Sequence, residues 1–344
     1  MAAVPERRRR VLLEHRARRV ATRPGAPTQA TPNISDAPRP RLIAVGGGKG
    51  GVGKTFIAAN VAITLARAGY RVIAVDTDVE GPNLHTLLGV RNPTRTLADF
   101  IAGRENNLMR LIVATPTENL GLIAATQGNL AGAQPDAQRR AEMLGALRRM
   151  PCDFVIVDCG AGAHSATLDY FLVSDDGLIV VHPEPTSVEN AYTFVRAAFY
   201  RRMQAALQKH DVRALVREAM DQRNARGIQT PLDLLREVEG MDLEDGQRFV
   251  ETMRRFRPRI VVNEVATAED VKLGFSISSV CRRFFGIDAD YIGYLNRDPA
   301  VREAVKQRRP LLDVAPDCDA AIYLKRIASK LAEGVPLPAA EATR

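Results

Sequence analysis

A glycine-rich segment, GGGKGGVGKT, occupies Gly46–Thr55 and follows directly on an apolar run that ends at Val45. From Gly48 onwards its residues fit the spacing G-x-x-x-x-G-K-[ST], in which glycines let successive backbone N–H groups turn toward a phosphate chain. A helical pattern begins at Thr55, so the first amides and the positive dipole end of that helix face the same phosphates. The alternative is a glycine turn with one surface lysine. The strand before the segment and the helix after it favour a phosphate-binding loop.

Two side chains at the end of the loop carry the predicted chemistry. Lys54 is expected to hold the β- and γ-phosphates, and the Thr55 hydroxyl is expected to hold Mg²⁺. The cofactors predicted from this loop are therefore a nucleotide and Mg²⁺. The loop residues predicted to contact the nucleotide are Gly48, Lys49, Gly50, Gly51, Val52, Gly53, Lys54, Thr55 and Phe56.

Short continuous apolar runs, each followed by a helical pattern, recur along the chain and predict parallel strands that are covered on both faces. The runs are Leu42–Val45, Val72–Val75, Phe154–Val157, Leu178–Val181, Ile260–Val262 and Ile292–Leu295. A further pair, Leu111–Ala114 and Leu120–Ala124, is compatible with two strands or with a strand and a loop. Helices are predicted at Thr55–Ala68, Ala137–Arg149, Thr186–His210, Ala268–Phe285, Pro299–Gln307 and Cys318–Ala332. The pattern predicts a doubly wound, mostly parallel α/β sheet, with the ligand at the carboxyl ends of the strands.

Three carboxylates follow two of these runs. Asp76 and Asp78 come at the end of the second run, and a loop there would hang over the phosphates. An Asp-x-Asp pair alone is often only a turn, so its weight here comes from its place after the phosphate loop. Asp158 ends the run Phe154–Val157, where a hard oxygen ligand can hold Mg²⁺ through its water shell.

Composition excludes several other classes. The chain has 344 residues, of which 46% are hydrophobic, enough for a large core, while the 5% aromatic content and the absence of Trp argue against a stacking platform for single-stranded nucleic acid. The four cysteines are scattered, so neither a disulfide framework nor a zinc or iron–sulfur site is indicated, which suits a reducing cytosol. No apolar run reaches 18 residues, and we expect neither a membrane span nor a signal peptide. A cytoplasmic location is predicted, with peripheral membrane contact left open.

The formal net charge of +8 is concentrated at the N-terminus, where residues 1–41 contain ten arginines and three acidic residues. Residues 1–40 are predicted to be a basic, disordered tail, because such a composition cannot bury enough apolar surface to order itself. The tail is either a weak electrostatic contact for nucleic acid or an anionic membrane, or simply solvated. The predicted domains are this tail, an ATPase domain at 41–333 with a charged helical insertion at 201–257, and a flexible C-terminal tail at 334–344.

The segment KGGVGKT, Lys49–Thr55, carries a second lysine at the position that marks the deviant Walker A motif. Here the sequence resembles the MinD/ParA family of ATPases, a SIMIBI-type P-loop fold. The resemblance implies ATP as the nucleotide and a homodimer that forms on ATP, in which Lys49 reaches the partner subunit's nucleotide. It also implies that Asp78 positions the attacking water and belongs to the metal site, with Asp76 supporting the loop. Asp158 then corresponds to Walker B, and Cys159–Gly162 resembles the second switch.

Two segments make the MinD and FlhG/FleN branch the most similar. HPEPTSVENAYTF, His182–Phe194, resembles the segment that follows the fourth strand in that branch, and Arg282–Leu312 resembles its C-terminal part. In VVNEV the resemblance assigns Asn263 to the adenine edge, and the absence of N-K-x-D favours ATP over GTP. The N-terminus, the C-terminus and the insertion all depart from the family pattern, which weakens any transfer of cellular role.

These observations predict a slow, partner-stimulated ATP hydrolase that acts as an ATP-dependent dimerisation switch, in the positioning or number control of a cellular structure, together with a regulatory protein partner that the sequence does not identify. The alternatives are a ParA-type DNA-partition ATPase and an assembly or metabolic enzyme on the same scaffold. A degenerate binding module is disfavoured, because both lysines and all three aspartates are present. The insertion is either a lid or docking hairpin, or a solvated decoration packed on the sheet.

Overall fold

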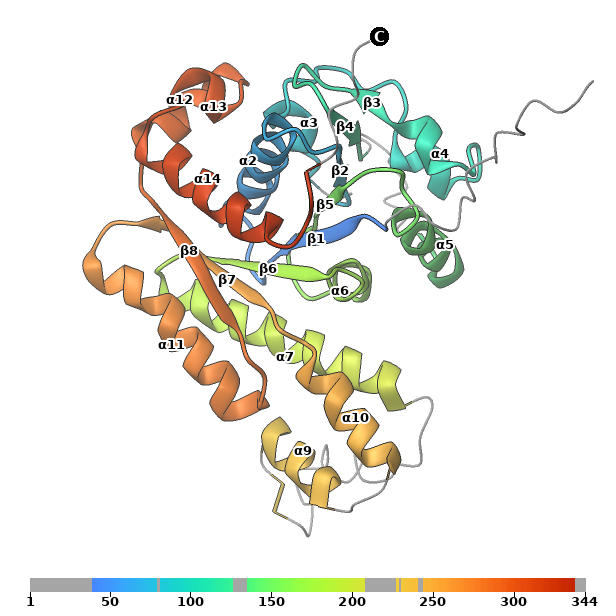
Figure 1. Cartoon of the computed structure of the whole chain (residues 1–344), viewed down its shortest axis with the longest axis vertical. Coiled ribbons are helices and arrows are strands. Elements are labelled where there is room, and N and C mark those ends of the chain that lie inside the picture. The colour runs from blue at the N-terminus through green and yellow to red at the C-terminus, as the bar shows by residue number, and fades with distance from the viewer. Residues whose placement is uncertain are drawn as a thin grey trace, which may run out of the picture. The chain divides into compact units, whose positions relative to one another are not determined.

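Every predicted strand is present in a mixed sheet whose order is β3-β4-β2-β5-β1-β6-β7-β8 (Figure 1). All neighbouring strands are parallel except β3 and β4, which pair antiparallel. The strands are β1 (Arg41–Gly46), β2 (Val72–Asp76), β3 (Val113–Ala114), β4 (Leu120–Ile123), β5 (Phe154–Asp158), β6 (Asp176–Val181), β7 (Arg259–Val265) and β8 (Asp290–Asn296). The doubly wound, mostly parallel α/β fold is thereby confirmed.

The coordinates come from a computed structural model, which describes residues 39–78, 81–125, 135–207, 227–228, 230–240 and 244–337. Almost all of the predicted basic tail and most of the predicted C-terminal tail lie outside these ranges, as do residues 208–226 of the predicted insertion. Within the described ranges, no helix combines the length and the apolar character that crossing a membrane requires.

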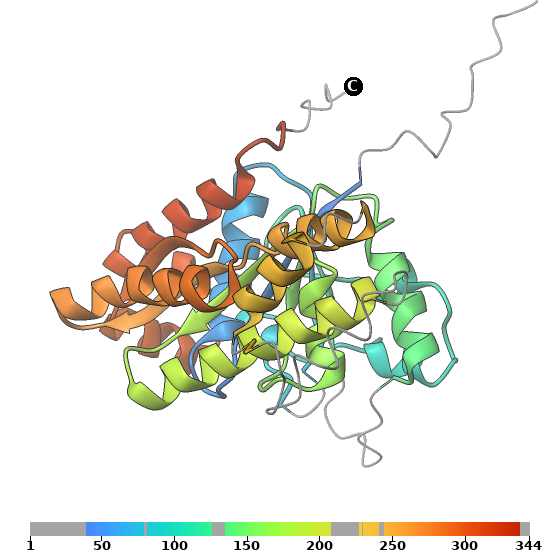
Figure 2. The ribbon, with the colours of Figure 1, turned by 90° about the horizontal axis from the view of Figure 1, so that it is seen from below.

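Helices cover both faces of the sheet, as the continuous apolar character of the strands requires (Figures 1 and 2). One face packs against α5, α6, α7 and α11, and the other packs against α2 and α14. The helices are α2 (Lys54–Arg67), α3 (Leu84–Leu87), α4 (Leu97–Ile101), η2 (Leu108–Leu111), α5 (Ala137–Leu147), α6 (Ser165–Leu172), α7 (Pro185–Leu207), α9 (Pro231–Gly240), α10 (Glu244–Arg254), α11 (Ala268–Phe285), α12 (Pro299–Gln307), α13 (Leu311–Val314) and α14 (Asp319–Ala332). The sequence did not predict α3, α4, α6 and α13, because helices this short carry too few turns for a periodic signal.

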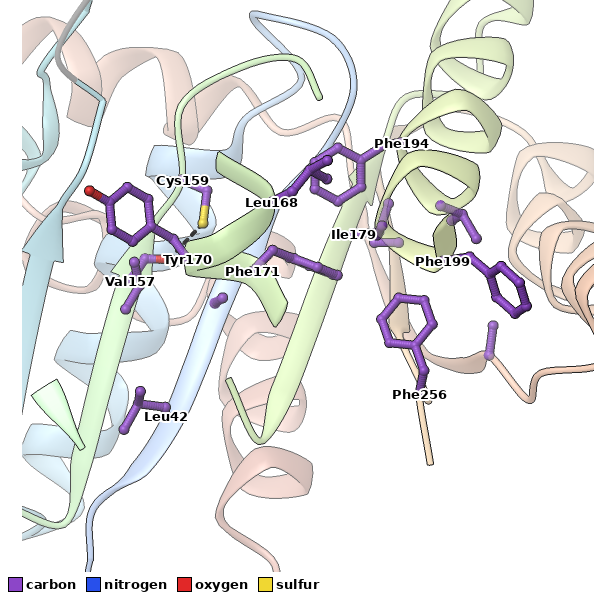
Figure 3. Close-up of a cluster of buried hydrophobic side chains, with 14 of the residues drawn as sticks. Leu42, Val157, Cys159, Leu168, Tyr170, Phe171, Ile179, Phe194, Phe199 and Phe256 are labelled. Carbon is purple, nitrogen blue, oxygen red and sulfur yellow. Dashed lines mark hydrogen bonds between the residues drawn. The ribbon is translucent and has the colours of Figure 1, made fainter. Parts of the chain in front are cut away.

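An aromatic cluster fixes the start of the glycine loop (Figure 3). The Phe171 ring meets the Phe194 ring edge-on with centroids 4.9 Å apart, and Phe256 contacts the same ring at 6.4 Å. Such pairs contribute about 0.5–1.5 kcal/mol beyond the area that they bury. Because a Cβ at Gly46 would lie 2.9 Å from Phe171 Cδ2, only glycine lets the end of β1 pack this closely. The cluster therefore sets the position at which the loop leaves the sheet.

The described part of the insertion packs into the helical layer. Helix α10 contacts α7, and α9 contacts α11, while Leu235 and Phe249 are buried in the core that these helices share with the sheet. Arg202 Nε donates to the Thr252 carbonyl at 3.0 Å. Since α10 leads directly into the start of β7, this part lies at the amino ends of the strands, opposite the glycine loop. The described residues of the insertion are therefore packed on the helical layer, away from the glycine loop.

Candidate nucleotide-binding site

The glycine loop connects β1 to α2 at the carboxyl edge of the sheet, and its shape depends on two glycines. Gly53 has φ 92°, in the left-handed region that favours glycine, and a Cβ there would lie 2.3 Å from Asn263 Nδ2. Asn190 lies near the amino end of α7, and a Cβ at Gly48 would lie 2.1 Å from its carbonyl oxygen. Larger residues at either position would push the loop off β7 or α7.

Lys54 begins α2 and is only 6% exposed. Its ammonium donates a hydrogen bond to the Lys49 carbonyl at 3.0 Å, so the side chain folds back along its own loop. Burial lowers the pKa of Lys54 below its usual value, while Asp158 and Asp78 act in the opposite direction. A buried cation near two carboxylates is placed to hold phosphate charge in cis, as the sequence predicts for this lysine.

Asp76 supports the loop after β2. Its carboxylate is fully buried and accepts hydrogen bonds from the backbone N–H groups of Asp78, at 3.0 Å, and Leu84, at 3.2 Å. Burial raises the pKa of Asp76 to about 7, and the two backbone donors oppose that rise. The Asp78 carboxylate accepts from Gly81 N at 2.9 Å and faces Gly160 of the loop after β5. The two predicted switch segments thus meet beside the phosphate loop.

Asp158 ends β5, and its side chain is the best candidate for a metal-site carboxylate. It is 1% exposed, and neither carboxylate oxygen accepts a hydrogen bond of ordinary geometry from the described residues. Burial raises the pKa of Asp158 well above its usual range and the neighbouring Asp76 raises it further, while the nearby Thr55 hydroxyl and Lys54 act in the opposite direction. A buried carboxylate without a partner is costly unless a cation or water completes the site. The donor set of Asp158 with the Thr55 hydroxyl fits Mg²⁺, which takes oxygen ligands.

Lys49, the second lysine of the loop, points away from its own phosphate site. Its ammonium donates to Glu184 Oε2 at 2.9 Å and to Thr186 Oγ1 at 3.2 Å, and its side chain is 38% exposed. Glu184 lies in the connection between β6 and α7, and Thr186 lies in the first turn of α7. Sequence reasoning singled out that segment but missed the contact, because nothing local links residues 135 positions apart.

Asn263, on β7, lies directly against the loop. Its amide Nδ2 donates to the Val52 carbonyl at 3.0 Å, and the residue is buried. The described geometry therefore gives Asn263 a bracing contact, and adenine recognition stays a prediction. The side chains of Val52 and Phe56 pack in the core beneath the loop. Gly50 and Gly51, in the middle of the glycine loop, are exposed.

The connection after β6 is held by its own polar contacts. The Ser187 hydroxyl accepts a hydrogen bond from the His182 backbone N–H at 3.0 Å. This contact closes the turn before α7. This turn is what presents Glu184 and Thr186 to Lys49.

A glycine loop between a parallel strand and a helix, with a buried lysine and two carboxylates converging beside it, defines a P-loop nucleotide-binding protein. The sequence matches the CobQ/CobB/MinD/ParA nucleotide binding domain over residues 43–311. The chain belongs to this family, which confirms the resemblance to the MinD/ParA ATPases.

Similar proteins of known family support the assignment of this chain to the MinD/ParA family. The antiactivator FleN of Pseudomonas aeruginosa is 27% identical over 302 residues, covering 87% of this chain and 88% of FleN. The septum site-determining protein MinD of Helicobacter pylori is 35% identical over 153 residues, which cover 44% of this chain and 56% of that protein. Among solved structures, MinD of Pyrococcus horikoshii complexed with Mg-ADP is similar in fold, with a TM-score of 0.59 at 21% identity, over 85% of this chain and 96% of that one. The chain is thus a MinD/ParA-family ATPase similar to FleN and MinD.

Proposed function

We propose that this chain hydrolyses ATP slowly and that its ATP-bound form is a homodimer, so that nucleotide state switches it between two assemblies. The observation that carries the proposal is the contrast between the two loop lysines. Lys54 is buried and folds along its own loop, whereas Lys49 lies at the surface with its ammonium directed outward to Glu184. A surface cation on the phosphate loop is suited to a phosphate of a second subunit, and the buried one to its own nucleotide.

Each predicted residue has a role in this proposal. Lys54 holds the β- and γ-phosphates, and Thr55 with Asp158 holds Mg²⁺, which neutralises phosphate charge when bound. Asp78 orients a water toward the γ-phosphate, and Asp76 keeps the Asp78 loop in place through its backbone contacts. Lys49 completes the partner subunit's site, and Asn263 contacts the adenine edge. Hydrolysis of ATP then ends the ATP-bound state that favours the dimer, and the subunits separate.

The relatives' names support a regulatory output. FleN is described as an antiactivator, MinD as septum site-determining, and one similar fold is that of a MinC:MinD complex from Aquifex aeolicus. We therefore propose that the chain controls the position or number of a cellular structure, together with a regulatory protein that stimulates its turnover. The protein acts in the cytoplasm or peripherally at a membrane. Any contact with lipid or nucleic acid rests on the arginine-rich residues 1–40 and weakens with salt.

Light scattering with a non-hydrolysable ATP analogue tests the switch. Wild type is expected to change from monomer to dimer mass when the analogue and Mg²⁺ are added, because the analogue holds the ATP state. Lys49→Ala is expected to bind the analogue and remain monomeric. Lys306→Ala, a lysine exposed on α12, is the matched control and should dimerise like wild type. Monomer mass for both wild type and Lys49→Ala would rule out the switch, and dimer mass for both would rule out the role of Lys49 in it.

A further inference from the structure

The strand β8 ends the sheet and leaves one edge free. It is last in the strand order and pairs only with β7 among the described strands. It runs for seven residues between α11 and α14 (Figure 1). The backbone groups on such an edge are a template on which another extended chain can pair.

Two hollows adjoin this strand: one lies on the α14 side, and the other lies mainly on the α11 side, with Lys330 of α14 lining both. The hollow on the α14 side, of about 530 Å³, is walled by Tyr294 and Tyr323, whose rings lie 4.7 Å apart. The hollow on the α11 side, of about 560 Å³, is walled by Tyr291 and Phe275, which meet edge-on at 4.9 Å. Phe275 is 63% exposed, an unusual state for a large apolar side chain. Successive side chains of an added strand would point to opposite faces of the sheet. The two hollows could receive these side chains.

The α14 side of this edge is basic without compensation. Lys325, Arg326 and Lys330 line the hollow, and no acidic residue does. Within the described ranges none of the three forms an ion pair with a carboxylate; Arg326 lies over the Tyr323 ring instead, 5.2 Å from its centroid. On the α11 side, Arg259 and Arg282 are paired with Asp176 and Asp288. The charge therefore selects a partner with acidic side chains on the face turned to α14.

Lys330 links the charge to the strand edge. Its ammonium donates to the carbonyl of Ile292 at 2.7 Å, at the register shift where Tyr291 and Gly293 pair with consecutive residues of β7. A lysine beside an edge strand discourages pairing with neutral strands, since pairing would have to displace a cation. A strand that brings a carboxylate offers this ammonium an ionic partner. Lys330 therefore favours acidic partners over neutral ones.

We propose that the β8 edge, with the α14 hollow beside it, is a docking surface for an extended acidic segment of a partner protein, which adds to the sheet as a further strand. The surface uses no residue of the phosphate site, so the proposal stands or falls separately from ATP hydrolysis.

The test uses the full chain and three fluorescent peptides. The first alternates Glu with Val and Thr, the second replaces Glu by Lys, and the third keeps every Glu but carries Pro at alternate positions, which prevents strand pairing. Anisotropy measures binding, and hydrogen exchange of residues 290–296 reports pairing. We expect only the first peptide to bind and to protect β8. Lys330→Glu and Arg326→Glu should each weaken it about tenfold. The matched control Lys306→Glu, which makes the same charge change on α12, should not.

Three outcomes would overturn the proposal. Equal binding of the proline peptide would mean charge attraction without strand addition. Wild-type affinity of the first peptide for Lys330→Glu would show that Lys330 does not select acidic partners. Protection of β8 that rises with protein concentration in the absence of peptide would make a second copy of the chain the occupant. ATP affinity measured on the same variants should be unchanged, which shows that the fold is intact.

Discussion

Lys49 of the phosphate loop and Glu184 of the β6–α7 connection form an ion pair at 2.9 Å within one chain. The lysine that is predicted to reach a second subunit is therefore held by its own subunit in the structure. Both side chains are exposed, 38% for Lys49 and 55% for Glu184. Ion pairs of this kind contribute about 0–1 kcal/mol, so the contact is weak enough to be exchanged for a phosphate.

The first prediction concerns the strength of the ion pair between Lys49 and Glu184. Glu184→Gln should leave the urea midpoint of unfolding close to that of wild type, because solvent screens both charges. Urea denaturation checks this. The matched control is Glu251→Gln, which removes another exposed ion pair, between Glu251 of α10 and Arg255 just after the helix. A clear loss of stability in Glu184→Gln alone would mean that Lys49 is held too firmly to leave.

Lys54 should be indispensable for nucleotide binding. Lys54→Ala removes a buried cation beside Asp158 and Asp78, and we expect ATP affinity to fall at least about thirtyfold, since truncating one member of a buried charge pair costs about 2–5 kcal/mol. Calorimetry with Mg·ATP measures the loss, and the thermal unfolding curve of the variant controls for folding. Unchanged affinity would remove the phosphate-site assignment.

Asp78 separates binding from hydrolysis. Its carboxylate is half-buried and accepts a hydrogen bond from Gly81 N of its own loop, whereas Lys54 lies at the start of α2, so we expect the nucleotide to stay bound when Asp78 is removed. Asp78→Ala should retain ATP, turn over roughly a hundredfold more slowly and accumulate as an ATP-bound dimer. Affinity, turnover and mass are measured on one preparation. Wild-type turnover would reject the catalytic role, and lost ATP binding would make Asp78 a metal-site residue only.

Asn263 donates a hydrogen bond to the Val52 carbonyl in the structure and is predicted to contact adenine as well. A single variant distinguishes the two roles. Asn263→Ala removes the hydrogen bond to the Val52 carbonyl as well as any contact with adenine. If adenine is read, ATP affinity should fall about tenfold while GTP affinity falls less, because GTP lacks the matching base edge. Competition binding of both nucleotides measures the ratio. A parallel loss for ATP and GTP would assign Asn263 to bracing the loop alone.

Much of the fold and half of the site could be predicted from the sequence because the signals are local. A continuous apolar run such as Phe154–Val157 specifies a buried strand without knowledge of its neighbours. The glycine loop likewise contains its own geometry, since strand, glycines, lysine and helix are consecutive. The roles predicted for Lys54 and Asp158 follow from their places at the start of a helix and the end of a strand. Short elements such as α6 were missed, because eight residues give too weak a period to recognise.

Relations between distant residues were decided only by the tertiary structure. Sequence alone determined that this is a P-loop protein with Asp158 at the end of a buried strand. It did not determine that Asp158 would be buried without a hydrogen bond of ordinary geometry from the part of the chain that the structure describes. Nor did it determine that Asn263 would donate to the Val52 carbonyl from 211 positions away, or that Lys49 would form an ion pair with Glu184. Those facts depend on which strand ends the sheet order brings together and on how α7 leaves β6. Local propensity specifies elements, whereas packing of the whole sheet specifies which side chains meet.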